Sequence, residues 1–398
     1  MEIEIGRGKK ARRAYGFDDI AIVPSRRTRD PDDVDISWKL GDYRFELPLL
    51  AAAMDGVVSA ATAKIVGKLG GLAVLNLEGV FTRYEDADEQ LARIARLPKE
   101  EATREMQAIY REPVKPELIR QRIEEMKAEP GVVAAASLTP QRVARYYELA
   151  LDAGLDVLVI QGTVVSAEHV SQTTTPLNLK EFIREVGVPV IVGGCASYHT
   201  GLHLMRTGAA GVLVGVGPGA ACTTRGVLGL GVPQATAIAD VAGARSTHML
   251  ETGEYVQVIA DGGMRTGGDV SKAIACGADA VMIGSPLARA YEAPGRGFHW
   301  GMATFHPSLP RGARVRTTQN GSLQEIITGP ARENDGTFNL MGALRTSMAT
   351  CGYRDIAEFN RAELMIAPAL QSEGKQLQRD QAVGMGARGG AMALAATE

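Results

Sequence analysis

A glycine-rich stretch that leads to a cysteine is the clearest chemical feature of the sequence. The stretch Gly215–Arg225 reads GVGPGAACTTR, so that Cys222 follows three glycines and a proline. Such a backbone forms a tight loop whose N–H or C=O groups can point at one ion, and a cysteine on it is an exposed nucleophile. Burial as a small apolar side chain is the alternative for a free cysteine. We expect burial for Cys276 and Cys351, leave Cys195 open between the two, and predict that Cys222 is catalytic.

Two further motifs with glycine stand at the ends of short apolar runs. Ile259–Gly263 reads IADGG and Val281–Ser285 reads VMIGS. Glycines there allow backbone donors to reach a phosphate, and the Asp261 carboxylate can accept hydrogen bonds from ribose hydroxyls. A turn cap is the alternative role for Asp261. In His299–Thr304 (HWGMAT), Met302 and the adjacent backbone offer contacts to a base, although this motif is weak on its own.

The elements that must position these residues are short apolar runs separated by amphipathic segments. We expect strands at Leu47–Met54, Leu72–Asn76, Val132–Ser137, Val157–Gln161, Val188–Gly193, Gly211–Gly215, Val256–Asp261 and Ala280–Gly284. We expect helices at Ala61–Leu69, Pro140–Ala153, Leu179–Val186, Tyr198–Thr207, Pro233–Leu250, Gly268–Ala275 and Leu340–Ala349. The strands are apolar on both faces, which is typical of a parallel sheet buried on both sides.

Eight such strands alternating with helices predict an α/β fold, a (β/α)8 TIM barrel. The glycines and polar residues gather just after the strands, where a barrel has its active site. A doubly wound open sheet is the alternative, but the first strand is not followed by its G-x-G-x-x-G signature.

We expect a single catalytic domain over residues 1–383 and a flexible tail over 384–398. Two segments interrupt the alternation within that domain. Residues 83–128, after the second strand, are charged and helical in pattern, and we expect a solvated excursion packed on the barrel. Residues 298–340, after the eighth strand, are polar and rich in turn residues, which predicts a flap or lid.

Composition disfavours several classes of protein. The 398 residues carry a net charge of -3, which argues against a nucleic-acid partner. The longest apolar runs have about eight residues, too few to cross a bilayer, and no signal peptide precedes them. Four cysteines without a C-x-x-C pair do not make a disulfide framework, so we expect a reducing cytoplasm.

Together these motifs resemble the IMP dehydrogenase/GMP reductase family, and in particular its IMP-dehydrogenase-related branch. The likeness rests on AAAMDGVVSAATAKIVGKLGGLAVLN, GVGPGAACTTRGVLGLGVPQATAIAD and IADGGMRTGGDVSKAIACGADAVMIGS, and it runs from about Ala11 to Ala367. The resemblance implies a barrel, a purine mononucleotide substrate, a nicotinamide cofactor and a homotetramer. It also implies a covalent bond from Cys222 to purine C2, with hydride moving to or from that carbon.

The resemblance also implies roles for individual residues. Thr224 matches a threonine close to the reacting carbon, and carbonyls of Gly217, Gly219 and Cys222 match a site for a monovalent cation such as K+. Substrate contacts are expected at Met54, Gly219, Asp261, Gly262, Gly263, Gly284, Ser285, His299, Gly301, Met302 and Ala303. The nicotinamide end is expected at Gln161, Gly162, Thr163, Gly215, Val216 and Gly217.

Two absences favour GMP reductase, with NADPH as the cofactor and NADH as the alternative. Residues 83–128 are too short for the regulatory module of IMP dehydrogenases, and roughly Thr304–Asn320 lacks the Arg-Tyr pair that activates water in those enzymes. An IMP dehydrogenase that uses NAD and another water-activating residue stays open, as does a non-catalytic purine-nucleotide sensor.

The chain also departs from both well-known enzymes. The departures are Asn76-Leu77 for His-Lys, Gln161 for aspartate, Gly194 for asparagine, Ala220 for serine and Arg311-Gly312 for the flap glutamate. The proton donor for ammonia release is therefore open between Thr224 and Glu78, and Glu78 has a solvated strand end as its alternative.

Overall fold

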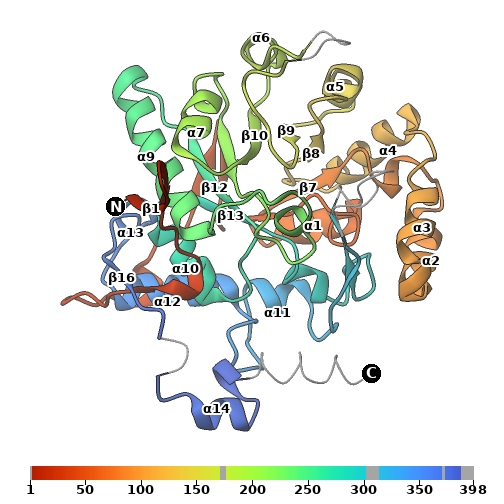
Figure 1. Cartoon of the computed structure of the whole chain (residues 1–398). Helices are drawn as coiled ribbons and strands as arrows, with labels where there is room; N and C mark the ends of the chain where they lie inside the picture. Colours follow the sequence, from red (N-terminus) through yellow and green to blue (C-terminus); the bar gives the residue numbers. More distant parts are fainter. Residues whose placement is uncertain (1, 171–175, 302–312, 370–372, 387–398) are drawn as a thin grey trace.

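Eight parallel strands close into a barrel in the computed structural model, which describes residues 2–170, 176–301, 313–369 and 373–386 (Figure 1). The strands are β6 (Leu49–Ala51), β7 (Leu72–Asn76), β8 (Ala135–Leu138), β9 (Val157–Gln161), β10 (Val190–Cys195), β11 (Gly211–Val214), β12 (Gln257–Asp261) and β13 (Ala280–Ile283). The barrel closes where β13 pairs with β6, with Met282 opposite Leu50. The predicted (β/α)8 fold is confirmed.

The strands β7 and β9 have the predicted bounds, the other six differ from the predicted ranges, and proline explains two of the differences. β6 begins directly after Pro48 and β10 directly after Pro189. Proline has no N–H to donate to a neighbouring strand, so it is found at the start of a strand rather than inside one. Within the barrel wall, Val192, Leu213 and Ile259 are fully buried, as expected for a sheet covered on both faces.

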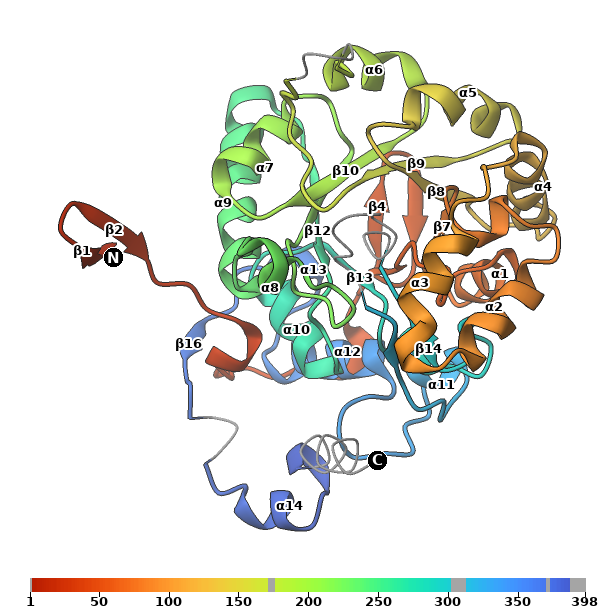
Figure 2. The same cartoon turned by 45° about the vertical axis from the view of Figure 1, so that its right-hand side comes forward.

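Helices cover the outside of the barrel (Figure 2). They are α1 (Ala60–Lys68), α4 (Pro116–Lys127), α5 (Val143–Asp152), α6 (Leu179–Val186), α7 (Tyr198–Met205), α9 (Gln234–Thr252), α10 (Gly267–Ala275) and α12 (Leu340–Thr350). Their ends follow ordinary capping chemistry. The Ser59 side chain accepts from the Thr62 N–H at the start of α1, and Gly187 ends α6 in the left-handed conformation.

The segment 83–128 contains three helices of two kinds. Its last helix, α4, packs against α1 and α5 and is therefore the regular barrel helix between β7 and β8. The other two, α2 (Ala87–Arg96) and α3 (Lys99–Ile109), form a helical hairpin beside the barrel (Figure 2). The insertion proper is thus the α2–α3 hairpin, and α4 belongs to the barrel alternation.

Smaller elements close the amino end of the barrel and carry the chain termini. The hairpin of β4 (Trp38–Leu40) and β5 (Tyr43–Phe45) lies next to the chain that enters β6. Its Trp38 stacks on Phe45 and donates its Nε1 hydrogen to Leu47 O at 2.9 Å. The remaining elements are β1 (Glu2–Gly6), β2 (Lys9–Arg12), β3 (Ile20–Ile22), α8 (Thr224–Leu228), β14 (Phe298–His299), β15 (Val315–Arg316), α11 (Leu323–Ile327), α13 (Ile356–Phe359), β16 (Leu364–Ile366) and α14 (Gln376–Asp380).

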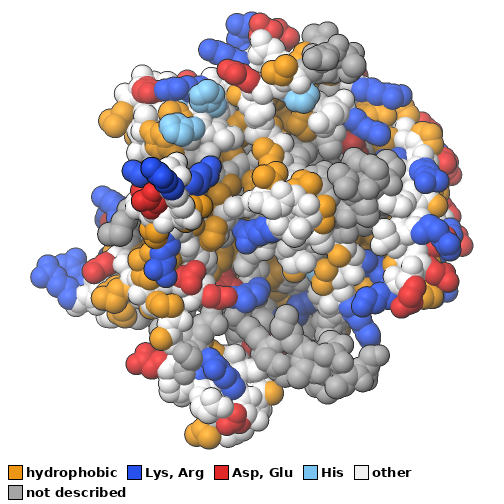
Figure 3. Space-filling model, viewed as in Figure 1, with side chains coloured by type: hydrophobic (Ala, Val, Ile, Leu, Met, Phe, Trp, Pro, Cys, Tyr) orange, Lys and Arg blue, Asp and Glu red, His pale blue; other side chains and the backbone are white. Residues whose placement is uncertain are grey.

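The surface carries charges of both signs. On the face shown in Figure 3, basic and acidic side chains are interspersed. No helix in the described part of the chain is both long and apolar enough to cross a membrane.

Candidate functional site

A cavity of about 590 Å³ opens at the carboxyl ends of the barrel strands. Its wall consists of residues that end or follow β6, β8, β9, β11, β12 and β13. The predicted site residues on this wall are Met54, Gln161, Gly162, Thr163, Gly215, Gly217, Gly219, Cys222, Asp261, Gly262, Gly263, Gly284, Ser285, His299 and Gly301. The structure therefore brings together residues from six separate strand ends.

Two of the predicted site residues are not on the wall of the cavity, and two more lie outside the described residues. Val216 and Thr224 are buried behind it, within the loop that carries Cys222. Met302 and Ala303 lie outside the described residues.

The structure also adds wall residues that the sequence reasoning missed. Among these are Thr139, Pro140 and Gln141 after β8, and Leu228 and Leu230 at the end of α8 and beyond. The position of the first three after a strand could have been recognised. The two leucines carry no chemical signal of their own.

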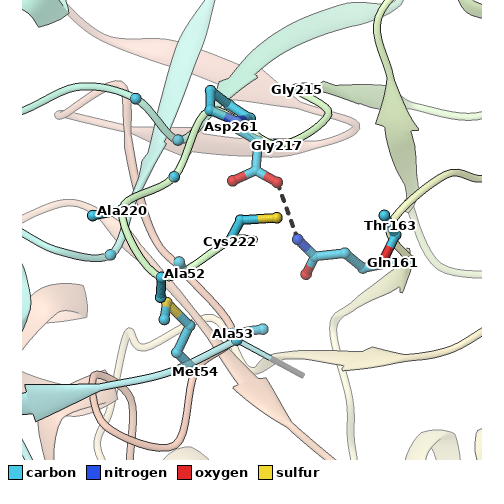
Figure 4. Close-up of a pocket in the computed structure, with 18 of the residues that line it drawn as sticks. Ala52, Ala53, Met54, Gln161, Thr163, Gly215, Gly217, Ala220, Cys222 and Asp261 are labelled. Carbon is cyan, nitrogen blue, oxygen red and sulfur yellow. Dashed lines mark hydrogen bonds between the residues drawn. The ribbon is translucent and has the colours of Figure 1, made fainter. Parts of the chain in front are cut away.

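Cys222 is presented by the predicted glycine-rich loop between β11 and α8. A tight turn holds the loop, in which the Cys222 N–H donates to Gly219 O at 3.0 Å. Cys222 Sγ lies 3.1 Å from Thr224 Oγ1 and points toward the space between Asp261 and Gln161 (Figure 4). The Cys222 thiol at the edge of the cavity is thus adjacent to the buried Thr224 hydroxyl, and such a pair suits nucleophilic addition with proton transfer.

The other three cysteines are more buried than Cys222. Cys195, Cys276 and Cys351 are buried, as predicted for the last two. Burial raises the pKa of the Cys195 and Cys276 thiols to about 12, because the charged thiolate loses its hydration. Among the four cysteines, Cys222 alone lines the cavity.

Asp261 ends β12 and faces Gln161, which ends β9 (Figure 4). Gln161 Nε2 donates to Asp261 Oδ2 at 3.1 Å, and no backbone N–H of the described residues donates to this carboxylate. Burial raises the pKa of Asp261 to about 6, with the Gln161 hydrogen bond opposing the shift. Gln161 Oε1 is itself buried without a hydrogen-bond partner in the described chain. Both side chains therefore retain hydrogen-bonding capacity toward a ligand.

The two glycines after Asp261 allow the neighbouring loops to approach closely. Gly262 and Gly263 have φ of 78° and 83°, in the left-handed region that side chains rarely adopt. A Cβ on Gly262 would lie 3.3 Å from Gly219 N, and one on Gly263 would lie 3.1 Å from Pro218 Cβ. Glycine at these positions therefore lets the β12 loop pack against the cysteine loop.

His299 is fully buried beside Ser285. Its Nε2 lies 2.7 Å from Ser285 Oγ, and burial lowers its pKa to about 4, so that the ring is neutral near pH 7. The described lining contains no lysine or arginine. An anion bound here would therefore be held by backbone N–H groups and the Ser285 hydroxyl rather than by a cationic side chain.

Glu78 lies behind the cavity wall. Its Oε1 accepts from the Thr139 N–H at 2.6 Å, and Arg142 Nε lies 3.3 Å from its Oε2. Both carboxylate oxygens are engaged, and Glu78 is not among the residues that line the cavity. Of the two proton-donor candidates, Thr224 is the one adjacent to Cys222.

The described residues contain no cluster of three or more histidine, cysteine or acidic side chains able to hold a metal ion. The predicted cation site uses backbone carbonyls instead, and neutral oxygens of this kind suit a weakly held monovalent ion. The Gly219 carbonyl accepts one hydrogen bond from Cys222 and keeps a second lone pair for such an ion.

Comparisons with known proteins agree with this arrangement. The family description "IMP dehydrogenase / GMP reductase domain" matches residues 14–375. A Mycolicibacterium smegmatis protein described as an uncharacterized oxidoreductase is 47% identical over 373 residues, which cover 92% of this chain and 99% of that protein. The inosine-5'-monophosphate dehydrogenase of Methanocaldococcus jannaschii is 26% identical, over 92% of this chain and 95% of that enzyme.

A solved structure shows the same fold. It is described as an IMP dehydrogenase/GMP reductase-like protein from Corynebacterium glutamicum, and it is similar with a TM-score of 0.87 and 44% sequence identity. The match covers 92% of this chain and 97% of that one. Fold and sequence thus agree over nearly the full length of both chains.

Proposed function

The chain belongs to the IMP dehydrogenase/GMP reductase family and is an oxidoreductase, and from this premise we propose that it is a GMP reductase. It converts GMP and NADPH into IMP, ammonia and NADP+ through a covalent bond between Cys222 and purine C2. The observation that carries the proposal is the thiol of Cys222, which lies at the edge of a cavity built from glycine-rich strand ends and 3.1 Å from the buried Thr224 hydroxyl.

The nucleotide occupies the side of the cavity formed by β6, β12 and β13. Backbone N–H groups of Gly263, Gly284 and Ser285 bind its phosphate beside Gly262, whose own N–H donates to Met282 O at 3.2 Å, and the Asp261 carboxylate accepts from the ribose hydroxyls. The base lies against Met54 and the backbone at Gly301, with Met302 and Ala303 expected to extend this contact. Binding here brings the purine beside Cys222, because the described residues of this set line the same cavity as Cys222.

The first chemical step is addition of the Cys222 sulfur to C2 of GMP. A C–S bond forms, the electron pair of the ring C2=N3 bond moves to N3, and N3 takes up a proton. The exocyclic amine then takes a proton and leaves as ammonia, while N3 gives up its proton and its electron pair re-forms the C2=N3 bond, which yields a thioimidate on Cys222. Thr224 transfers the proton, since its hydroxyl is adjacent to the sulfur.

The nicotinamide end of the cofactor binds against Gln161–Thr163 and Gly215–Gly217. The cavity continues on this side to Thr139, Leu228 and Leu230, which provide polar and apolar contacts for a large planar ligand. When bound, the reduced nicotinamide supplies the hydride that C2 accepts as the C–S bond breaks. Gly217, Gly219 and Cys222 would hold a monovalent cation through their carbonyls and thereby order the loop.

Reduction is favoured over dehydrogenation because the described lining of the cavity holds no side chain that is free to activate water. The ionisable side chains of the described lining are Cys222, Asp261 and His299. Cys222 is the nucleophile, Asp261 faces the ribose, and His299 is buried against Ser285. The segment around Thr304–Asn320 has no Arg-Tyr pair to take their place.

The remaining features of the proposal rest on the sequence and on family likeness. We propose a homotetramer in the cytoplasm, with residues 1–383 as one catalytic domain, and no nucleic-acid or membrane partner. Size-exclusion chromatography with light scattering tests the tetramer.

Nicotinamide absorbance with two substrate pairs tests the assignment. GMP with NADPH should give IMP, ammonia and loss of absorbance at 340 nm, whereas IMP with NAD should give little or no xanthosine monophosphate. Steady formation of xanthosine monophosphate would make the protein an IMP dehydrogenase. Tight nucleotide binding without turnover of either pair would make it a purine-nucleotide sensor.

A further inference from the structure

Trp300 joins the nucleotide site to the α2–α3 hairpin. It stands between His299 and Gly301, both of which line the cavity, and its own side chain is 2% exposed. Trp300 Nε1 donates to Tyr110 Oη at 2.9 Å, and Tyr110 is the C-cap residue directly after α3. A wall of the proposed nucleotide site is therefore bonded to the insertion.

The Tyr110 hydroxyl also bonds to the loop after β6. It donates to Asp55 Oδ2, which accepts a second hydrogen bond from the Val80 N–H at 2.9 Å. Asp55 is buried and directly follows Met54, a cavity residue. Burial raises the pKa of Tyr110 well above its ordinary value, so the hydroxyl keeps its proton and remains a donor. One hydroxyl thus connects three segments that are far apart in the sequence.

A second bond between the hairpin and the site comes from Arg314, just before β15. Its Nη1 and Nη2 donate to Ile94 O at 2.5 Å and Leu97 O at 2.8 Å, the carbonyls at the end of α2. A guanidinium at a helix C-terminus is favoured by the helix dipole as well as by these bonds. The same guanidinium lies 4.4 Å from the ring centroid of Phe298 in β14.

These contacts hold both strands of the β14–β15 ribbon from one side. β14 carries His299 and pairs with β15 through His299 and Val315. Tyr110 bonds to Trp300, the residue after β14, and Arg314, the residue before β15, bonds to the end of α2. Movement of the α2–α3 hairpin would therefore displace His299 and Gly301 together.

We propose that the α2–α3 hairpin sets the geometry of the nucleotide site, with Tyr110 and Arg314 as the positioning residues. The proposal rests on the function proposed above, because it takes the wall formed by His299 and Gly301 to be the nucleotide wall. It replaces the expectation of a merely solvated excursion with a specific task for the insertion.

The substitution Tyr110→Phe tests the proposal, with Tyr84→Phe as its matched control. Tyr110→Phe keeps the ring and removes the hydroxyl that bonds Trp300 and Asp55. Tyr84→Phe removes another hydroxyl, just before the hairpin. The Tyr84 hydroxyl donates to Ile109 O at 2.8 Å and does not bond to Trp300. We expect KM for GMP to rise about tenfold in Tyr110→Phe, with kcat changing much less, because misplaced binding groups weaken binding. Tyr84→Phe should retain the wild-type KM.

Fluorescence provides a readout that needs no turnover. The chain has two tryptophans, so Trp38→Phe leaves Trp300 as the only source of tryptophan fluorescence. In this background, Tyr110→Phe should change the Trp300 emission maximum and raise its quenching by acrylamide, whereas Tyr84→Phe should change neither. Far-ultraviolet circular dichroism establishes that each variant is folded. Arg314→Lys, which keeps the charge but loses the paired donors, should raise KM in the same way and takes the place of Tyr110→Phe if that variant is unfolded.

Unchanged KM and unchanged Trp300 emission in Tyr110→Phe would overturn the proposal. Equal effects in Tyr110→Phe and Tyr84→Phe would also overturn it, since the hairpin would then act only through its stability. Absence of GMP turnover in the wild type would instead refute the proposed function. In that case the Trp300 emission of the variants still decides whether the hairpin positions the ribbon.

Discussion

The two ends of the barrel differ in how completely their buried polar groups are hydrogen-bonded. At the amino end, Asp279 precedes β13 and is fully paired, with Arg245 Nη1 at 2.6 Å, Tyr255 Oη at 2.6 Å and the Val258 N–H at 2.7 Å. At the carboxyl end, Asp261 has Gln161 as its one partner in the described chain. Unmet hydrogen-bonding capacity in a folded protein calls for an explanation, and a ligand supplies one.

Other groups repeat this contrast. Gln161 Oε1 and His299 Nδ1, both at the carboxyl end, are buried without partners in the described residues. Cys276, on the amino-end side, is buried, whereas Cys222 borders the cavity. This contrast is typical of barrel enzymes, in which the amino end contributes to stability and the carboxyl end to binding and chemistry.

The largest expected effect separates the two cysteines. Cys222→Ala should lower kcat by at least about 10³-fold, because the C–S bond cannot form. Nucleotide affinity should stay nearly intact, because the phosphate and ribose contacts supply the binding. Cys276→Ala is the control from the opposite end and should retain turnover. Activity in Cys222→Ala would exclude the covalent mechanism.

The two aspartates should differ in what their loss affects. Asp261→Ala should weaken GMP and IMP binding by about 10- to 150-fold, since a charge-assisted hydrogen bond contributes about 1.5–3 kcal/mol. Asp279→Ala should lower the free energy of unfolding by about 3–5 kcal/mol, because it leaves Arg245 buried without its carboxylate. Calorimetric titration and denaturant unfolding of both variants measure the two effects. An unchanged dissociation constant in Asp261→Ala would remove this residue from the site.

The raised pKa of Asp261 predicts opposite pH dependences for binding and for stability. Burial raises this pKa from its ordinary 3.8 to about 6, so the folded, ligand-free protein holds the proton more tightly than the unfolded chain. The contribution of Asp261 to stability is therefore fully present below pH 4 and is lost as the pH rises through about 6. GMP binding should strengthen over the same window, because ribose hydroxyls donate to the ionised carboxylate.

Titrations of GMP into wild type and Asp261→Ala from pH 5 to 7 measure this dependence. The phosphate group of GMP titrates in the same range, with a second pKa of about 6. Its contribution is the same for both proteins, so the difference between wild type and variant isolates the effect of Asp261. Ionisation of Asp261 should make GMP binding to the wild type about tenfold weaker at pH 5 than at pH 7. Asp261→Ala should lack this part of the pH dependence. Identical pH dependence in both proteins would contradict an ionised Asp261 in the complex.

The smallest expected effect is at Ser285. Its hydroxyl is shared between His299 and the proposed phosphate, so Ser285→Ala should weaken GMP binding by about 2- to 10-fold, the value of one hydrogen bond. Ser271→Ala removes a hydroxyl that donates to Gly267 O inside α10, away from the cavity, and should not affect binding. Equal affinities for wild type and Ser285→Ala would place the phosphate elsewhere.

Much of the fold and part of the site follow from local sequence. Short apolar runs that alternate with amphipathic segments predicted the barrel, because a strand buried on both faces must be apolar on both faces. Glycine and polar residues at the strand ends predicted which loops border the cavity, because parallel strands all end at the same side. Cys222 and Asp261 were identified in this way, and both line the cavity.

The contacts that only the tertiary structure decided join residues distant in the chain. Asp55, Tyr110 and Trp300 meet because barrel closure brings the β6 loop, the insertion and the β14–β15 ribbon together. The same closure buries His299 and so makes it neutral, and it places Glu78 behind Thr139 rather than in the cavity. Local sequence specifies which residues form a strand or a loop. Burial, pairing and pKa depend on what lies across the barrel, which no short stretch of sequence contains.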